Sequence, residues 1–123
     1  ISNIIFKTLK LTRPKILIIG IAYKKNIDDV RESPALKIIS DLKKRGSHVN
    51  YYDPLIKQLP SNRNYFSKMI SIKLSKSSLK KYDGVLICTD HDSINYKLIY
   101  NSASKIFDAR NVYKFSSKKL IIV

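Results

Sequence analysis

The sequence predicts an α/β fold, a three-layer sandwich built on a mostly parallel sheet. Two apolar runs, KILIIGIA at residues 15–22 and VLIC at residues 85–88, are almost uninterrupted, which is typical of strands covered on both faces. A segment of helical periodicity, residues 33–46, lies between the first run and another strand pattern at residues 48–52. This order is that of a βαβ unit, whose crossover connection builds parallel sheets.

The helix of this unit has recognisable start and stop signals. Ser33 is a favoured N-cap residue, and Pro34 fits the first turn because its missing N–H needs no partner there. The basic residues 43–45 face the negative end of the helix dipole, and Gly46 suits the conformation that ends a helix. Apolar residues at intervals of three and four give the helix one buried stripe: Ala35, Leu36, Ile38, Ile39 and Leu42.

The rest of the chain is harder to interpret in its middle than at its ends. Residues 1–11 are helix-like, and residues 55–80 show the weakest pattern of the chain, with only a short strand assigned at residues 70–74. The other expected elements are a helix at about residues 94–102, a strand at residues 105–107, and a tail or edge element at residues 112–123.

Length and composition exclude several classes of protein. The 123 residues suit one domain, and the single cysteine, Cys88, excludes a disulfide scaffold. No apolar run approaches the roughly 20 residues of a transmembrane helix, and the first residues lack the apolar core of a signal peptide. We therefore expect a cytoplasmic protein that does not enter membranes. Because the chain begins with isoleucine rather than methionine, we also expect a fragment of a longer protein.

The charge balance opens a different interpretation. With 24 Lys and Arg against 9 Asp and Glu, the net charge is +15, and a basic α/β module binds nucleic acid or another polyanion when its cations gather on one surface. Here the basic residues are mostly lysines scattered along the chain, without an interleaved aromatic stacking motif. The pattern favours a solvated, lysine-rich surface, and the polyanion-binding module stays as an alternative.

Polar segments follow three of the expected strands, at residues 23–33, 89–92 and 108–111. In open parallel sheets ligands bind at the carboxyl ends of the strands, so we expect these segments to meet at one edge. Their cations, together with the N–H groups of the helix that begins at Ser33, predict a pocket for a phosphate or carboxylate. The cations concerned are Lys24, Lys25, Arg31 and Arg110.

A purely structural interpretation of the first segment stays open beside this one. Its charged residues are also able to bridge one another and cap the helix without any ligand; they are Asp28, Asp29, Arg31 and Glu32. The first strand ends in Gly20-Ile21-Ala22 and lacks G-x-G-x-x-G, so the sequence does not support an independent dinucleotide site. Cys88 lies in a buried strand pattern, and we predict no metal site around it and residues 90–92.

The polar loop and the helix that follows it carry a specific resemblance. Residues 20–36, GIAYKKNIDDVRESPAL, resemble the signature of the C-terminal, nucleotide-sugar-binding domain of the UDP-glucose/GDP-mannose dehydrogenase family. The form of this segment is most like the branch that acts on UDP-N-acetylhexosamines, such as UDP-N-acetylglucosamine 6-dehydrogenase. Further motifs agree with the family in order and approximate spacing: Tyr51-Tyr52-Asp53-Pro54, Tyr82-Asp83-Gly84-Val85, Thr89-Asp90-His91 and Phe107-Asp108-Ala109-Arg110-Asn111.

The resemblance implies a domain organisation and an activity. It implies a Rossmann-like nucleotide-sugar-binding domain at residues 15–112, after the end of a connecting helix or linker at residues 1–14 and before a C-terminal tail at residues 113–123. Enzymes of the family oxidise the C6 alcohol of a nucleotide sugar to a carboxylate with two NAD, in polysaccharide biosynthesis. The implied partners are a UDP-sugar, the other domains of the same enzyme and, in the full-length enzyme, further copies of it.

The resemblance also implies roles for single residues. Tyr23 and Lys24 match the aromatic–lysine pair that contacts the UDP-sugar, and Arg110 matches the arginine that closes on it. Arg31 matches the arginine that reaches the NAD held by the preceding domain. Asn26 stands where the family commonly has Asp, and we expect little effect because both residues suit a turn. The residues expected to position the loop and cap the helix are Asp28, Asp29, Glu32 and Ser33.

The departures from the family concern catalysis. The N-terminal domain that holds most of the NAD contacts and the central segment with the nucleophilic cysteine have no counterpart here, and Cys88 lies in a strand of the wrong domain. We therefore assign no catalytic residue and expect no turnover by this chain alone. A remnant that folds but binds nothing is the remaining alternative.

Overall fold

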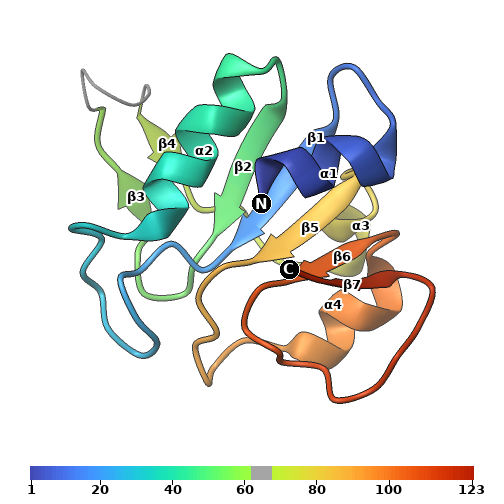
Figure 1. Cartoon of the computed structure of the whole chain (residues 1–123). Coiled ribbons are helices and arrows are strands. Elements are labelled where there is room, and N and C mark those ends of the chain that lie inside the picture. Colours follow the sequence, from blue (N-terminus) through green and yellow to red (C-terminus); the bar gives the residue numbers. More distant parts are fainter. Residues whose placement is uncertain (62–67) are drawn as a thin grey trace.

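A parallel sheet forms the centre of the molecule (Figure 1). The computed structural model describes residues 1–61 and 68–123, and within them five strands pair in the order β2-β1-β5-β6-β7. Every pairing in this sheet is parallel, which confirms the predicted α/β fold. The strands are β1 (Lys15–Ile19), β2 (His48–Tyr52), β5 (Gly84–Ile87), β6 (Ile106–Asp108) and β7 (Leu120–Ile122).

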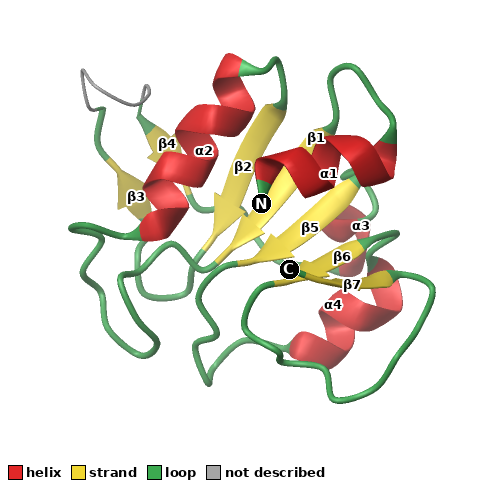
Figure 2. Ribbon diagram, viewed as in Figure 1, coloured by secondary structure: helices red, strands yellow, loops and turns green. Residues whose placement is uncertain are grey.

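Helices cover both faces of this sheet, which gives three layers (Figure 2). Successive side chains of β1 point to opposite faces, as the pleat of a strand requires. Ile16 and Ile18 pack in the core under α1 and α2, whereas Leu17 and Ile19 pack in the core under α3 and α4. The helices are α1 (Ser2–Leu9), α2 (Pro34–Lys44), α3 (Lys76–Leu79) and α4 (Tyr96–Ser102).

The helix α2 begins and ends as its sequence signals predict. The Ser33 hydroxyl accepts a hydrogen bond from the Ala35 N–H at 3.2 Å, so Ser33 is the N-cap and Pro34 lies in the first turn. Gly46 follows the helix with a φ of 96°, in the left-handed region. The apolar stripe faces the sheet, and Ile39 and Leu42 are fully buried.

The first strand stops three residues earlier than predicted because of Gly20. Its φ is 77°, a left-handed conformation that glycine adopts without strain. A Cβ at this position would lie 2.1 Å from the carbonyl oxygen of Thr89, so the loops after β1 and β5 approach each other where no side chain fits. The early end of β1 thus follows from the close approach of these two loops.

The middle of the chain contains two elements that the pattern did not predict. Of the strand expected at residues 70–74, only Ile70 lies in a strand, the two-residue β4 (Met69–Ile70). β4 pairs antiparallel with β3 (Gln58–Leu59), which the pattern did not predict. The helix α3 was likewise missed, because it has only four residues. Residues 62–67 of the weakly patterned segment lie outside the described residues.

The last residues form an edge strand, which is one of the two outcomes left open for residues 112–123. β7 pairs parallel with β6 and closes one side of the sheet, next to the C-terminus (Figure 1). The chain leaves β1 for β2 on one side and later returns to β5 on the other side of β1. This change of direction places the usual ligand crevice of an open α/β sheet at the carboxyl ends of β1 and β5.

Candidate functional site

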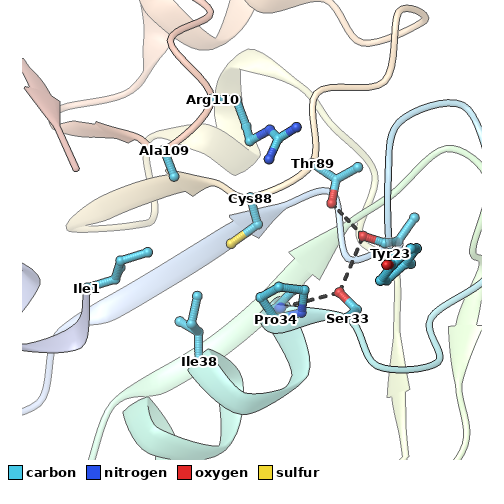
Figure 3. Close-up of a pocket in the computed structure, with 11 residues that line it drawn as sticks. Ile1, Tyr23, Ser33, Pro34, Ile38, Cys88, Thr89, Ala109 and Arg110 are labelled. Atoms are coloured by element: carbon cyan, nitrogen blue, oxygen red, sulfur yellow. Dashed lines mark hydrogen bonds between the residues drawn. The ribbon is translucent and has the colours of Figure 1, made fainter.

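A pocket of about 200 Å³ lies at the carboxyl ends of the central strands (Figure 3). All three polar segments singled out in the sequence contribute to it, so the structure brings them to one edge as expected. It is lined by Ile1, Ala22, Tyr23, Ser33, Pro34, Ala35, Ile38, Cys88, Thr89, Ala109 and Arg110. Of the predicted ligand contacts, Tyr23 and Arg110 therefore share a pocket.

Arg110 is the cation of this pocket, and the loop that carries it is firmly held. The buried carboxylate of Asp108 accepts hydrogen bonds from the backbone N–H groups of Arg110, Val112 and Tyr113 at 3.0–3.1 Å. The Arg110 side chain is 49% exposed, and its Nε lies 3.4 Å from an oxygen of Asp90. Within the described residues its terminal NH₂ groups have no further partner, so they are available to an anion.

Tyr23 and Lys24 lie on the exposed side of the same edge. Tyr23 is 53% exposed, and its backbone N–H donates to the carbonyl of Asp29 at 2.7 Å, which closes the loop on itself. Lys24 is exposed as well but does not line the pocket, and its ammonium group has no hydrogen bond or ion pair in the described part of the chain. The aromatic ring is thus at the pocket, whereas the lysine lies beside it.

Arg31 lies in an adjoining depression that Tyr23, Asp29 and Glu32 also line. Its side chain is 87% exposed and bonds the Asp29 carboxylate through Nε and Nη2, with a shortest distance of 2.8 Å. This pairing lowers the pKa of Asp29 to about 2. The Asp29–Arg31 pair therefore fits the alternative in which the charged residues of the loop bridge one another without a ligand. The guanidinium nevertheless faces solvent.

The other residues predicted to position the loop divide into two kinds. Ser33 caps α2, and its hydroxyl also donates to the Ala22 carbonyl at 3.3 Å, an oxygen that accepts from the Thr89 hydroxyl at 2.7 Å (Figure 3). Asp28 and Glu32 are exposed, and no side-chain hydrogen bond involves either of them in the described ranges. Glu32 instead contributes through its backbone, which turns into the helix with a φ of 58°.

Cys88 forms part of the pocket wall, with its sulfur on the same side as Ile1 and Ile38 (Figure 3). Burial raises the pKa of its thiol to about 12, against a smaller opposing effect of the Arg110 charge. The thiol is therefore protonated at neutral pH and is a poor nucleophile. Among residues 1–61 and 68–123, no three His, Cys, Asp or Glu residues are grouped so that they could hold a metal ion.

A buried contact between a histidine and an aspartate, which the sequence pattern did not predict, lies beneath the loop. His91 and Asp53 have no exposed side-chain surface, and His91 Nε2 lies 3.0 Å from Asp53 Oδ2. His91 Nδ1 accepts a hydrogen bond from the backbone N–H of Asn26 at 2.7 Å. Asp53 and His91 each come after a strand of the parallel sheet, and this position could have predicted that they lie close together. The sequence pattern did not show that both side chains turn inward.

Asn26 has a larger role than expected for a residue that merely suits a turn. Its side-chain oxygen accepts the Asp92 backbone N–H at 2.9 Å, which fixes the orientation of the amide. Its NH₂ group then donates to the Asp92 carboxylate at 2.8 Å, and this bond, with the nearby charge of Lys25, lowers the pKa of Asp92. An aspartate at position 26 would have no donor for this carboxylate.

Comparison with known proteins supports the resemblance noted in the sequence. The model of the UDP-glucose/GDP-mannose dehydrogenase family, UDP binding domain, matches residues 17–115. A UDP-N-acetyl-D-mannosamine dehydrogenase from Methanococcus maripaludis is 35% identical over 86 residues, which are 70% of this chain and 18% of that protein. A UDP-glucose 6-dehydrogenase from Pongo abelii is 32% identical over 131 residues, covering 91% of this chain and 26% of that protein.

Solved structures agree with this result. A UDP-D-ManNAc dehydrogenase from Pyrococcus horikoshii superposes with a TM-score of 0.72 at 26% identity, and the match covers 98% of this chain and 28% of that one. A GDP-mannose dehydrogenase from Pseudomonas aeruginosa reaches the same TM-score at 16% identity and so shows the fold alone. These neighbours confirm the Rossmann-like architecture. The chain spans between 18% and 30% of the lengths of these four relatives.

No helix in the described part of the chain is long and apolar enough to cross a membrane.

Proposed function

The chain belongs to the UDP-glucose/GDP-mannose dehydrogenase family, and we propose that it binds the UDP-sugar substrate of an NAD-dependent nucleotide-sugar 6-dehydrogenase. The sugar class we propose is a UDP-N-acetylhexosamine, since relatives named UDP-N-acetyl-D-mannosamine dehydrogenases are among those that match. The whole enzyme, with its other domains and its self-association, would work in the cytoplasm, where nucleotide sugars are supplied.

One observation carries this proposal: an aromatic ring and an arginine from distant parts of the sequence share one pocket at the switch point of the sheet. Tyr23 follows β1 and Arg110 follows β6, yet both line the same cavity. An aromatic face suits a nucleobase or a sugar ring, and a guanidinium with free NH₂ groups suits a diphosphate oxygen. The backbone N–H groups at the start of α2 add to the attraction for negative charge.

The size of the pocket indicates that this chain covers only one side of the ligand. Clefts that enclose a drug-sized molecule measure about 300–1,000 Å³. The cavity at Tyr23 and Arg110 measures about 200 Å³. Lys24, which is exposed beside the cavity, is then placed to meet the part of the phosphates or sugar that extends beyond it.

For NAD, the contact we propose from this chain is Arg31. The turn after β1, Gly20-Ile21-Ala22, lacks the glycine-rich pattern by which such a turn holds a pyrophosphate. Arg31 is exposed at the rim and fixed on one side by Asp29, so it fits contact with an anion held by another part of the enzyme. When bound, NAD accepts hydride from the substrate; in this assignment it is held mainly by a domain outside the chain.

The test is a titration of the isotope-labelled chain with UDP and with UDP-N-acetylglucosamine, followed by backbone amide NMR. We expect shifts concentrated around Tyr23, Ser33 and Arg110. Arg110→Gln should weaken binding by about 10- to 100-fold, the value of a charge-assisted hydrogen bond to phosphate. Arg13→Gln is the matched control, because it removes the same charge from an exposed residue before β1, at the opposite end of the strand.

Three results would contradict the proposal in different ways. An equal loss of affinity in both variants would mean that net charge, not the pocket, attracts the nucleotide. No shift at millimolar nucleotide would favour the non-binding remnant. Tight binding to duplex DNA or RNA, with a steep dependence on salt, would favour the polyanion-binding module.

A further inference from the structure

A buried chain of hydrogen bonds lies beneath the loop that carries Tyr23 and Lys24, and none of the roles given above uses it. The side chains of Asp53 and His91 are both fully buried, 3.0 Å apart. Asp53 Oδ2 also accepts the backbone N–H of Ile21 at 2.9 Å, and His91 Nδ1 accepts that of Asn26 at 2.7 Å. The pair therefore holds the loop backbone on both sides of Tyr23 and Lys24.

The partners of the imidazole define its protonation state. Nδ1 faces a backbone N–H, which can only donate, so Nδ1 carries no proton. The ring proton is then on Nε2, which donates to the Asp53 carboxylate. His91 is thus a neutral imidazole with one donor and one acceptor, and each is used by a different segment of the chain.

We propose that His91 is a positioning residue of the UDP-sugar site, an inference that rests on the proposed function. Held by Asp53, its Nδ1 fixes the backbone at Asn26 and so sets where the loop presents Tyr23 and Lys24 to the ligand. Thr89, two residues earlier, bonds the Ala22 carbonyl of the same loop, so one short segment after β5 positions the loop at both places.

The bond to Asn26 differs from an ordinary bond of the core. Asn26 is exposed, so water would satisfy its N–H if the loop moved away. The contact is therefore needed by the fully buried Nδ1 of His91 and not by Asn26, so its effect on Asn26 is to hold the loop against the imidazole. Asn26 has a φ of 64°, and its side chain is tied to Asp92, which keeps the N–H directed at the imidazole.

Two substitutions separate the two hydrogen bonds of His91. His91→Asn places an amide oxygen near the former Nδ1 and keeps an acceptor for Asn26, but it does not reach Asp53. His91→Gln places an amide NH₂ near the former Nε2 and keeps a donor for Asp53, but it leaves the Asn26 N–H without its partner. Both replace the ring by an amide, so each is the matched control of the other.

If His91 positions the loop, the less stable of these two variants should be the one that binds the ligand more tightly. His91→Asn should unfold at the lower urea concentration, because it strips a buried carboxylate of a donor. It should nevertheless bind UDP-N-acetylglucosamine within about twofold of the unsubstituted chain, whereas His91→Gln should bind about tenfold more weakly, the effect of one hydrogen bond. Amide relaxation should show residues 23–26 more mobile in His91→Gln only. Affinity that simply follows stability would overturn the proposal.

A measurement on the unsubstituted chain tests the proposal without any ligand. Nitrogen NMR of the imidazole should show a protonated Nε2 and an unprotonated Nδ1, and the Asn26 amide proton should be shifted downfield and exchange slowly. A protonated Nδ1 would overturn the positioning role whether or not a nucleotide binds. Failure of UDP-N-acetylglucosamine to bind, with these signals present, would instead count against the proposed function, and loop mobility in the two variants would still decide the role of His91.

Discussion

The loops that follow β1 and β5 both leave buried parallel strands at the same edge of the sheet, but they differ in which of their polar side chains are exposed. The β1 loop, residues 20–33, exposes its aromatic ring and its arginine: Tyr23 is 53% exposed, and the Arg31 side chain 87%. The β5 loop, residues 88–95, turns Thr89 and His91 inward, with exposures of 5% and 0%. The difference teaches that the β1 loop supplies exposed side chains for a ligand, whereas buried side chains of the β5 loop hold the β1 loop in place.

The β1 loop has hydrogen bonds of its own, such as that from the Tyr23 N–H to the Asp29 carbonyl, but other segments attach it to the sheet. Among the described hydrogen bonds, the backbone of the β1 loop is tied to Asp53 at Ile21 and to the β5 loop at Ala22 and Asn26. Loops carry function when a rigid scaffold positions them, and here part of the scaffold is a second loop, whose Thr89 and His91 are buried. Substitutions at the contact between the two loops should therefore disturb the site more than substitutions of exposed residues in either loop.

The largest effect is expected at the point where the two loops cross. Gly20→Ala should destabilise the chain by about 3 kcal/mol or more, because the new Cβ meets the Thr89 backbone and the φ of 77° disfavours alanine. Gly46→Ala is the control: its φ of 96° gives similar strain, but the nearest atom lies 3.7 Å away, and we expect about 1 kcal/mol. Urea unfolding measures both. Equal losses would mean that the close approach to Thr89 is unimportant.

A smaller effect is expected where the β5 loop bonds the β1 loop. Thr89→Val keeps the shape of the side chain and removes the hydroxyl that donates to the Ala22 carbonyl at 2.7 Å. The oxygen retains the weaker bond from Ser33, so we expect a loss of about 1–2 kcal/mol in urea unfolding. Thr12→Val, at an exposed position before β1, should change stability by less than about 0.5 kcal/mol. A neutral result at Thr89 would remove this bond from the positioning scheme.

A change confined to the outer side of the contact should act on electrostatics more than on the fold. In Asn26→Asp, the donor to the Asp92 carboxylate is replaced by a second carboxylate. Because that donor is the main cause of the lowered pKa of Asp92, the pKa should rise, which a carboxyl-carbon NMR titration measures. Lys25→Gln removes the other main cause and should raise the same pKa by less. An unchanged Asp92 titration in Asn26→Asp would show that the two loops are not joined there.

The contrast between the loops also explains how far the sequence could predict this molecule. Periodicity and end signals predicted β1, α2 and β2 because each has a local cause, such as the Ser33 N-cap and the stripe that contains Ile39 and Leu42. Because ligands bind at the carboxyl ends of parallel strands, the strand order then predicted that the segments carrying Tyr23 and Arg110 would meet at one edge of the sheet. Those steps use only local pattern and strand order.

The inward side of the site could not be predicted in this way. Asp53 and His91 are 38 positions apart, and β1 lies between the strands that precede them. Their contact depends on how two loops pass over the end of β1 at Gly20, which no periodicity records. The same holds for β7, since three residues of an edge strand give too short a pattern to separate from a tail.

The smallest effect is expected within the exposed part of the β1 loop itself. The Arg31 guanidinium lowers the pKa of Asp29 from 3.8 to about 2, so the pair contributes fully above pH 3.8 and is lost as the pH falls through about 2. A carboxyl-carbon titration should place the Asp29 midpoint near 2, and Arg31→Gln should return it toward 3.8. The Asn26 amide signal at neutral pH should stay unchanged in Arg31→Gln, because the backbone there is held by His91 and not by the ion pair. A shift of that signal would show that the exposed pair helps to position the loop, and the division of roles between the two loops would then be wrong.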